Sequence, residues 1–336
     1  MNWSEQVILL TGGTGSFGNK FVDTMLKKFH PKTIRIFSRD ELKQYEMQKR
    51  FNHPSLRYMI GDVRDKDRVH RAVEGVTMII HAAALKHVPV CEYNPFEAVK
   101  TNIIGAQNLI EAAIEHDVPR TVALSTDKAT NPTNLYGATK LCLERLFIAA
   151  NSYAGPHPVR FSCVRYGNVV GSRGSVVPLW LSQAASGTLS LTDNRMTRFW
   201  ITLEQGVKLV TDTAETMHGG EIFVPKIPSM KMTDLARIIG PDCKLKEVGI
   251  RPGEKLHEAL LTEDEARHTI ELEDKYVVEP EHHWWDFENW KIGKRAPEGF
   301  RYESHTNTQW LKDEELHKMV EQVAVENGLP VPAKVN

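Results

Sequence analysis

The sequence predicts an α/β fold built on a doubly wound parallel sheet, with a smaller lobe formed mainly by the C-terminal half. Short apolar runs alternate with amphipathic helical segments, the first run ends in a glycine-rich loop, and polar residues follow several of the runs. Alternating strands and helices joined by right-handed crossovers are typical of a parallel sheet covered on both faces. We expect residues 1–170 to form the sheet domain and 171–336 mainly the lobe, with some later segments returning to the sheet.

Composition excludes several classes of function. The 336-residue chain has a formal net charge of −1 and a pI near 6.9, which give no electrostatic reason to expect nucleic acid or a membrane surface as partner. No apolar run approaches the roughly 20 residues of a membrane-spanning helix, and the polar start is unlike a signal peptide. The four cysteines show no paired spacing, as is typical of reduced thiols. We therefore expect a cytoplasmic protein, and a homo-oligomer of unspecified size.

The first apolar run, Val7–Leu10, ends in a loop that indicates dinucleotide binding. Gly13, Gly15 and Gly18 fit the G-x-G-x-x-G fingerprint, and Gly12 begins its wider-spaced variant. Such glycines allow a tight turn, a close approach of the backbone to a pyrophosphate, and packing of the next helix on the strand. The helix N-terminus then offers N–H groups to the phosphates. The sheet domain is therefore predicted to be of the Rossmann type.

The second apolar run, Thr33–Phe37, favours NADP as the dinucleotide. An NAD site usually has a carboxylate about 20 residues after the loop, where it binds the ribose 2′-hydroxyl. Here Ser38 stands at that position, with Arg39 beside it and Lys43 one turn further on. A hydroxyl and two cations suit a 2′-phosphate. Asp40 is open to a second interpretation, as the N-cap of the helix that follows.

Two further runs lead to the same predicted edge of the sheet. Leu56–Ile60 ends before Asp62, which could bind the adenine amino group or cap the next helix. Val76–His81 ends in small alanines that let a ligand pass close, followed by Lys86. In doubly wound folds, ligands bind at the carboxyl ends of the strands. Residues 97–115 are predicted to form one long amphipathic helix between the fourth strand and the fifth.

The fifth run, Thr121–Leu124, delivers the residues that carry chemistry. Tyr136 and Lys140 are four apart on one predicted helix, so the ammonium could stabilise a phenolate and make the tyrosine a general base. Ser125 or Thr126 could hydrogen-bond the same substrate oxygen. The neighbouring Asp127-Lys128 pair adds a carboxyl and an amine. The alternatives are an incidental Tyr and Lys on an exposed helix and an ion pair at the surface.

The Thr11–Gly18 loop, the Ser125-Thr126 pair and Tyr136-x-x-x-Lys140 together resemble the extended short-chain dehydrogenase/reductase superfamily, which acts largely on nucleotide sugars. The resemblance spans essentially the whole chain. In this superfamily the Thr126-Asp127-Lys128 triplet is similar to the inverting UDP-N-acetylglucosamine 4,6-dehydratases, among them the soluble enzyme that opens pseudaminic acid biosynthesis. Retaining dTDP-glucose 4,6-dehydratases have Thr-Asp-Glu there, and 4-epimerases have small or hydroxyl residues.

Two other segments, Leu85–Pro89 and Met196–Trp200, are also similar to the inverting dehydratases. The resemblance implies oxidation at C4 by NADP, loss of water across C5 and C6, and reduction at C6. Tyr136 would take the 4-hydroxyl proton, Asp127 would protonate O6, and Lys128 would remove the C5 proton if its amine is neutral. We expect an enclosed site to depress the pKa of Lys128 in that direction. Lysine in place of glutamate implies reprotonation from the other face, and hence inversion to UDP-2-acetamido-2,6-dideoxy-β-L-arabino-hex-4-ulose.

The resemblance extends to the second half. There the superfamily places Asn168 and Arg251 on the substrate diphosphate, Glu254 on the ribose and Val169 near the nicotinamide. The expected catalytic residues are Asp127, Lys128, Tyr136, Thr126 and Lys140. The expected cofactor-binding residues are Gly12, Thr14, Gly15, Ser16, Phe17, Gly18, Ser38, Arg39, Lys43, Asp62, Val63, Ala82, Ala83, Leu124, Ser125, Tyr136, Lys140 and Val169. The expected substrate-binding residues for UDP-N-acetylglucosamine are Lys86, Asn168, Thr192, Arg195, Arg251 and Glu254.

Three alternatives stay open. The chain could be a UDP-sugar 4-epimerase, a dehydratase that feeds capsular fucosamine, or a catalytically silent NADP-binding regulator. Arg195 and Arg198 could equally form a solvated basic turn. His282 and His283, next to two tryptophans, could suggest a metal ion, but they lack partners at ligand spacing, so we predict no metal site.

Overall fold

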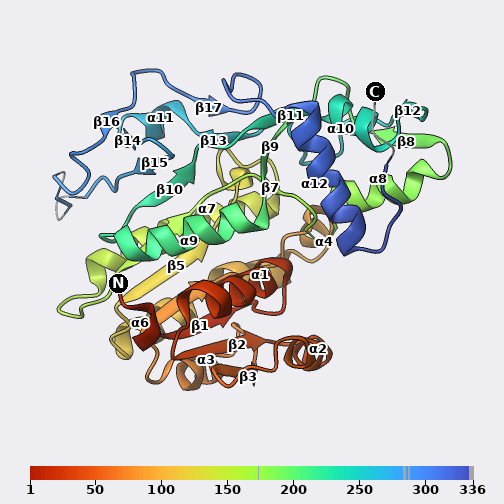
Figure 1. Cartoon of the computed structure of the whole chain (residues 1–336). Helices are drawn as coiled ribbons and strands as arrows, with labels where there is room; N and C mark the ends of the chain where they lie inside the picture. The colour runs from red at the N-terminus through yellow and green to blue at the C-terminus, as the bar shows by residue number, and fades with distance from the viewer. Residues whose placement is uncertain (173, 283–284, 287, 333–336) are drawn as a thin grey trace.

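The structure is a computed structural model that describes residues 1–172, 174–282, 285–286 and 288–332. Its centre is a 10-stranded sheet with the strand order β16-β14-β15-β10-β6-β5-β4-β1-β2-β3 (Figure 1). The strands from β3 to β10 in this order run parallel, and β15, β14 and β16 extend the sheet in antiparallel fashion. The predicted doubly wound fold is confirmed. The strand bounds are β1 Val7–Thr11, β2 Thr33–Ser38, β3 Leu56–Ile60, β4 Met78–His81, β5 Arg120–Leu124, β6 Phe161–Val164, β10 Ile222–Pro225, β14 Thr269–Glu271, β15 Lys275–Val278 and β16 Lys294–Arg295.

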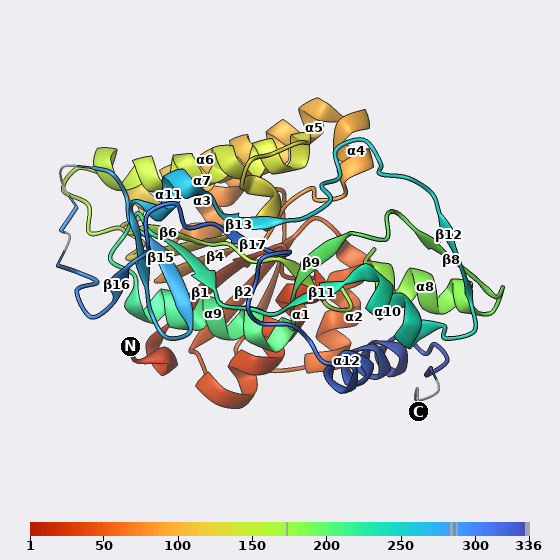
Figure 2. The same cartoon turned by 90° about the horizontal axis from the view of Figure 1, so that it is seen from above.

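Helices cover both faces of this sheet, as Figure 2 shows from above. One face carries α1, α2 and α9, and the other carries α3, α6 and α7. Their buried sides and the strands form one apolar core, because strands covered on both faces bury nearly every side chain. The helix bounds are α1 Ser16–Thr24, α2 Glu41–Phe51, α3 Lys66–Val73, α6 Gly105–Glu115, α7 Leu135–Tyr153 and α9 Leu203–Thr216.

The helix predicted over 97–115 is interrupted by a π turn. It consists of α5 (Pro95–Val99), the π segment Lys100–Ile104 and α6. Within that turn Asn102 is fully buried, and its side-chain amide donates to the Leu85 carbonyl at 2.8 Å and to Thr139 Oγ1 at 2.9 Å. The turn therefore fastens the loop after β4 to helix α7, which carries the predicted catalytic residues. Local π turns are frequent at functional sites.

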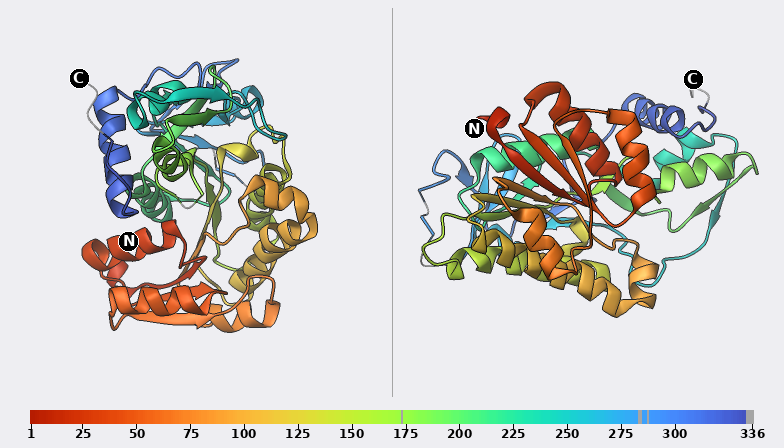
Figure 3. Two further views of the ribbon diagram at one scale, coloured as in Figure 1. Left: turned by 90° about the vertical axis from the view of Figure 1, so that its right-hand side faces the viewer. Right: turned by 90° about the horizontal axis from the view of Figure 1, so that it is seen from below.

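A second lobe lies beyond the carboxyl edge of the sheet (Figures 1 and 3). Its own apolar cluster joins Trp180, Leu235 and Val320, and α12 packs there against α8 and α10. Strand β10 and helix α9 come from the second half of the chain but complete the large sheet. The remaining bounds are α4 Val88–Tyr93, β7 Asn168–Val169, α8 Val176–Ala184, β8 Thr188–Leu191, β9 Thr197–Ile201, β11 Ser229–Lys231, α10 Met232–Ile239, β12 Lys244–Glu247, β13 Ala259–Leu261, α11 Glu263–Ala266, β17 Tyr302–Glu303 and α12 Asp313–Glu326, with short 3-10 turns at Trp3–Glu5 and Asp127–Ala129 and a π segment at Met25–Phe29.

A buried arginine ties the sheet to the second half of the chain. Arg165, just after β6, has no exposed surface, and its guanidinium donates to Glu144 of α7 at 2.9 and 2.6 Å. The same group donates to Glu265 of α11 at 3.0 and 2.8 Å and to the Leu260 carbonyl at 3.0 Å. These charges can be buried because each of them is hydrogen-bonded to a partner of opposite charge.

In the described part of the chain, no helix is long and apolar enough to cross a bilayer.

Candidate active site

The loop between β1 and α1 fits a dinucleotide pyrophosphate. Gly12 has φ of +66°, and a Cβ there would lie 2.8 Å from the backbone of Ala82 and Ala83, so only glycine fits between the two loops. A Cβ on Gly18 would lie 2.1 Å from the Gly13 carbonyl oxygen. The N-cap of α1 is Gly15, a residue with no side chain that could cap the helix. Such an N-terminus suits an anion.

The residues predicted to choose the dinucleotide surround the end of β2. Asp40 accepts from the Lys43 amide at 3.0 Å, which confirms its role as N-cap of α2, and it also pairs with the Lys43 ammonium at 2.5 Å. Ser38 Oγ accepts from Gln44 at 3.0 Å. Arg39 is about half exposed, and its guanidinium lies 3.7 Å from Asp62. The Ser38 hydroxyl, the Arg39 guanidinium and the Lys43 ammonium therefore lie together at the end of β2.

Asp62 does not cap the next helix, so that alternative is wrong. Asp65 caps α3 instead, by accepting from the Arg68 amide at 3.0 Å. The Asp62 carboxylate accepts from the Arg64 backbone at 3.0 Å and from its guanidinium at 2.8 and 2.6 Å. The same carboxylate lies 3.7 Å from the Arg39 guanidinium.

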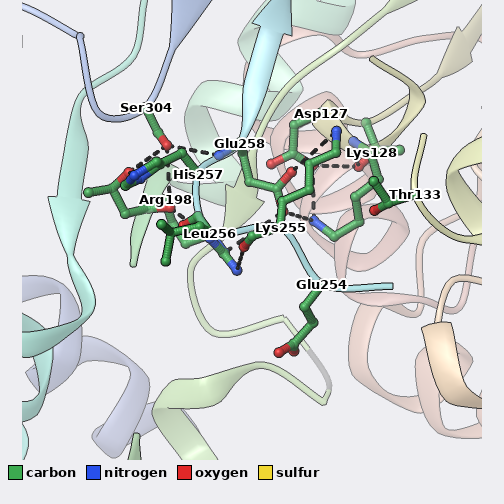
Figure 4. Close-up of polar contacts among 12 residues, drawn as sticks. Asp127, Lys128, Thr133, Arg198, Glu254, Lys255, Leu256, His257, Glu258 and Ser304 are labelled. Atoms are coloured by element: carbon green, nitrogen blue, oxygen red, sulfur yellow. Dashed lines mark hydrogen bonds and ion pairs between the residues drawn. The ribbon is translucent and has the colours of Figure 1, made fainter. Parts of the chain in front are cut away.

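The alternative of a surface ion pair is wrong, because the Asp127 carboxylate is buried and the Lys128 side chain is only 23% exposed. Asp127 has no exposed surface, and its Oδ1 lies 3.0 Å from Lys128 Nζ (Figure 4). Thr126 Oγ1 donates to the same Asp127 oxygen at 2.9 Å. Asp127 and Lys128 are the first two residues of the 3-10 turn that follows β5, and Thr126 is its N-cap.

The expectation of a depressed pKa for Lys128 is wrong. Burial alone would lower it, but the Asp127 and Glu258 carboxylates outweigh burial and raise the pKa of Lys128 above its ordinary value. Nearby anions favour the charged form of an enclosed amine, and here two carboxylates do so. The raised pKa favours the ammonium form of Lys128, which needs a proton acceptor before it can act as a base.

Tyr136 and Lys140 share the buried face of α7 as predicted, but their electrostatic relation differs from the expectation. Lys140 Nζ donates to the Leu124 carbonyl at 2.8 Å, and burial lowers the pKa of Lys140 to about 8. Burial raises the pKa of Tyr136 to about 12, against the charge of Lys128 and a hydrogen bond with Thr126. The cation that acts on the phenol is thus Lys128, and the phenol remains protonated.

Sequence reasoning missed Glu258. This glutamate is only 3% exposed, and its Oε1 lies 3.5 Å from Lys128 Nζ and 3.8 Å from Arg198 Nε. Its other oxygen lies 3.9 Å from Lys255 Nζ. Figure 4 shows these side chains meeting between the two halves of the chain. Glu258 stands far from Asp127 in sequence, and no fixed spacing links the two. The only local signal was its place next to the Arg251–Lys255 segment.

The predicted substrate residues fall into two groups. Asn168 lies on β7 opposite Trp200, and its buried Oδ1 has no hydrogen-bond partner among the described residues. The Gly253 carbonyl accepts from Thr133 and Asn134, which docks the segment that holds Arg251 and Glu254 on the loop before α7.

The other predicted contacts are more open. Lys86 lies at the surface in the loop after β4, where partial desolvation by the surrounding protein and, second, the charge of Lys128 lower its pKa. Arg195 is 67% exposed and pairs with Asp193 at 2.7 Å just after Thr192, away from the buried pair. Arg198 does not form the solvated basic turn weighed above, because it is buried and donates to the carbonyls of Thr197, Lys255 and Leu256.

The polar edge of the sheet holds buried oxygens that have no hydrogen-bond partner within the described chain: Ser125 Oγ, Asp127 Oδ2, Asn168 Oδ1, Glu254 Oε2 and Glu258 Oε2. Buried polar atoms are normally paired, so such a group is suited to a polar ligand. His283 and Trp284, two of the residues weighed for a metal ion, lie outside the described residues. Among the described residues, no group of three or more His, Cys, Asp or Glu side chains could hold a metal ion.

The glycine loop and the buried Tyr136-x-x-x-Lys140 face meet at one sheet edge and define a protein of the extended short-chain dehydrogenase/reductase type. Residues 8–280 match the family model described as "Polysaccharide biosynthesis protein". The chain belongs to this family, and the resemblance seen in the sequence is confirmed.

Similar proteins share nearly the whole chain. A UDP-N-acetylglucosamine 4,6-dehydratase (inverting) from Campylobacter jejuni subsp. jejuni serotype O:2 is 51% identical over 95% of this chain and 98% of its own. A UDP-glucose 4-epimerase from Rickettsia massiliae is 42% identical over 82% of this chain and 83% of its own. Among solved structures, the X-ray structure of Pen from Bacillus thuringiensis is 39% identical, with a TM-score of 0.86 over 95% of this chain and 99% of that one.

Proposed function

We propose that the protein is a hydro-lyase, a UDP-N-acetylglucosamine 4,6-dehydratase that inverts C5 and uses NADP as a recycled cofactor. The observation that carries this proposal is the buried Asp127-Lys128 pair, which adjoins Tyr136 through Thr126. A tyrosine and a lysine on α7 serve any reaction that moves a hydride, whereas the elimination of water needs a further acid and base. The inverting dehydratase from Campylobacter jejuni, at 51% identity, supports the same activity. The product would enter the pathway to pseudaminic acid.

The cofactor fits the residues at the carboxyl edge of the sheet. The glycine loop would hold its pyrophosphate, and the residues at the end of β2 would hold its adenosine end. When bound, the nicotinamide would supply the hydride chemistry for oxidation at C4 and reduction at C6. All other steps fall to side chains of this protein.

A chain of hydroxyls carries the proton that the 4-hydroxyl loses when C4 is oxidised. Tyr136 takes the 4-hydroxyl proton and passes its own to Thr126, which in turn donates to Asp127 at 2.9 Å. This relay needs no free phenolate, in keeping with the raised pKa of Tyr136. Asp127 becomes a carboxylic acid. It then protonates O6, so that water leaves while the C5 proton goes to Lys128, and Lys128 returns a proton to C5 on the other face.

Incubation with UDP-N-acetylglucosamine in D2O tests the proposed function. We expect NMR to show a 4-keto-6-deoxy sugar with deuterium at C5 and the L-arabino configuration, because the C5 proton is exchanged on a lysine. A 4-epimer that keeps its 6-hydroxyl would overturn the proposal in favour of an epimerase, the activity named for the relative from Rickettsia massiliae. Bound NADP without any turnover would favour a regulator.

The proposed preference for NADP depends on Arg39. We expect Arg39→Ala to weaken NADP binding about 10- to 100-fold and to leave NAD binding nearly unchanged, since hydrogen bonds to charged groups contribute roughly 1.5–3 kcal/mol. Fluorescence titration with both dinucleotides measures this difference. Lys32→Ala is the matched control, because Lys32 is an exposed cation at the opposite end of β2. Equal weakening of NADP and NAD by Arg39→Ala would contradict a 2′-phosphate contact.

A further inference from the structure

The ammonium of Lys128 is held between two carboxylates that come from opposite halves of the chain. Asp127 follows β5 at 3.0 Å from Nζ, and Glu258 precedes β13 at 3.5 Å (Figure 4). Asp127 also accepts from Thr126 and is thereby engaged with the relay from Tyr136. Glu258 Oε2 has no hydrogen-bond partner within the described chain, although it is buried. Oε1 is the oxygen that faces the Lys128 ammonium, and Oε2 lies 3.9 Å from Lys255 Nζ, so the carboxylate keeps an oxygen on which it can hold a proton.

The protein holds Glu258 in place through its backbone rather than through its carboxylate. The Glu258 amide donates to Ser304 Oγ at 3.0 Å, and the Ser304 amide donates to the Glu258 carbonyl at 2.8 Å. Ser304 is fully buried and its hydroxyl contacts Thr197 Oγ1 at 2.7 Å. Arg198 and Lys255 approach the carboxylate no closer than 3.8 Å. The carboxylate is therefore fixed in position by its backbone, and Lys128 is the nearest of the described cations to it, at 3.5 Å.

The proton balance of the proposed dehydration requires such a group. After C4 is oxidised, Asp127 holds the proton that came through Thr126, so it cannot also take one from Lys128. Lys128 must nevertheless be a neutral amine before it can remove the C5 proton. We propose that Glu258 is the positioning residue that takes this proton from Lys128 and returns it at the end of the cycle. This inference deepens the proposed function and rests on it.

The resulting steps balance without any further reactant. The Lys128 ammonium gives a proton to Glu258, and the free amine takes the C5 proton as Asp127 protonates the leaving O6. Lys128 then gives a proton back to C5 as C6 is reduced, and Glu258 restores the ammonium. Asp127 ends as a carboxylate, because its proton left with the water. Every side chain of the site therefore returns to its starting state.

The experiment compares wild type, Glu258→Gln and Glu258→Asp with UDP-N-acetylglucosamine. At neutral pH we expect Glu258→Gln to lower kcat by about 10²-fold or more with little change in KM, because an amide cannot accept the proton. Oxidation at C4 should persist. A 4-keto sugar that still carries its 6-hydroxyl should therefore accumulate to about one equivalent per site, measured by mass spectrometry. The kcat of this variant should rise with pH as solvent takes over the removal of the proton, whereas that of the wild type should not.

A purely structural role predicts otherwise. If Glu258 only joins the two halves, Glu258→Gln will lower the Tm while its pH profile stays parallel to that of the wild type, and the inference will be wrong. Glu258→Asp keeps the carboxylate but withdraws it by one methylene group. It should therefore lose about tenfold in kcat and keep the wild-type pH profile; full activity in this variant would also overturn the inference, even if Glu258→Gln does not fold.

The control is Glu263→Gln, because Glu263 is a half-exposed carboxylate of the same lobe that pairs only with Arg301 among the described residues. Its kcat and pH profile should match those of the wild type. Failure of the wild type to form any 4-keto-6-deoxy sugar would refute the proposed function itself. A wild type that turns over alongside an equally active Glu258→Gln would refute the role of Glu258 alone.

Discussion

Replacement of Lys128 by alanine is expected to lower formation of the 4-keto-6-deoxy sugar by roughly 10²–10⁴-fold, the usual contribution of a positioned acid or base. The reason is that, in the proposed mechanism, Lys128 exchanges the proton at C5 and its neighbour Asp127 protonates O6. The affinity of this variant for NADP should not change, because the glycine loop and the end of β2 lie at other strands of the carboxyl edge of the sheet. NMR of the reaction and a binding titration measure the two properties separately.

Two further variants make this prediction specific. Lys128→Arg keeps the cation between Asp127 and Glu258, so the fold should persist, but a guanidinium does not lose its proton and the dehydration should still fail. Lys66→Ala removes a half-exposed lysine that pairs with Glu111 on the sheet domain, and it should leave turnover unchanged. Turnover of Lys128→Ala at the wild-type rate would refute the assigned role of the lysine.

Arg165→Met is expected to reduce the free energy of unfolding by about 3–5 kcal/mol, because loss of one partner leaves buried charges uncompensated. The Arg165 guanidinium has no exposed surface, and it contacts Glu144 and Glu265 at 2.6 and 2.8 Å. Methionine fills much of the same volume, so the loss reports chiefly on the two carboxylates. Urea denaturation followed by circular dichroism measures it.

An exposed pair provides the comparison for this buried one. Arg301 pairs with Glu263 at 2.6 Å, and both side chains are about half exposed. Exposed ion pairs typically contribute about 0–1 kcal/mol, so Arg301→Met should change the stability little. Equal denaturation midpoints for Arg165→Met and Arg301→Met would show that the buried pairs do not anchor β6 to α7 and α11.

Local sequence signals were sufficient for much of the fold. The apolar run at Val7 and the glycines after it predict β1, the turn and α1, since strand burial and the φ of Gly12 depend on neighbouring residues. Tyr136 and Lys140 are four apart on a helix, so their common face follows from helical periodicity, whereas its burial depends on tertiary packing. The π turn at Lys100–Ile104 was missed, because it depends on Asn102 reaching Leu85 and Thr139 in other elements.

The sequence by itself determined the sheet domain, the dinucleotide loop and the identity of the residues at the end of β5. Only the tertiary structure decided which neighbouring groups set the pKa values of these residues. It brought Glu258 from the second half of the chain to Lys128, and the field of two buried carboxylates raised a pKa that burial alone would have lowered. Charge interactions act over a few ångströms in space whatever the separation along the chain. A pattern of neighbouring residues can therefore predict which side chains are a candidate acid and base, but it cannot predict their protonation states.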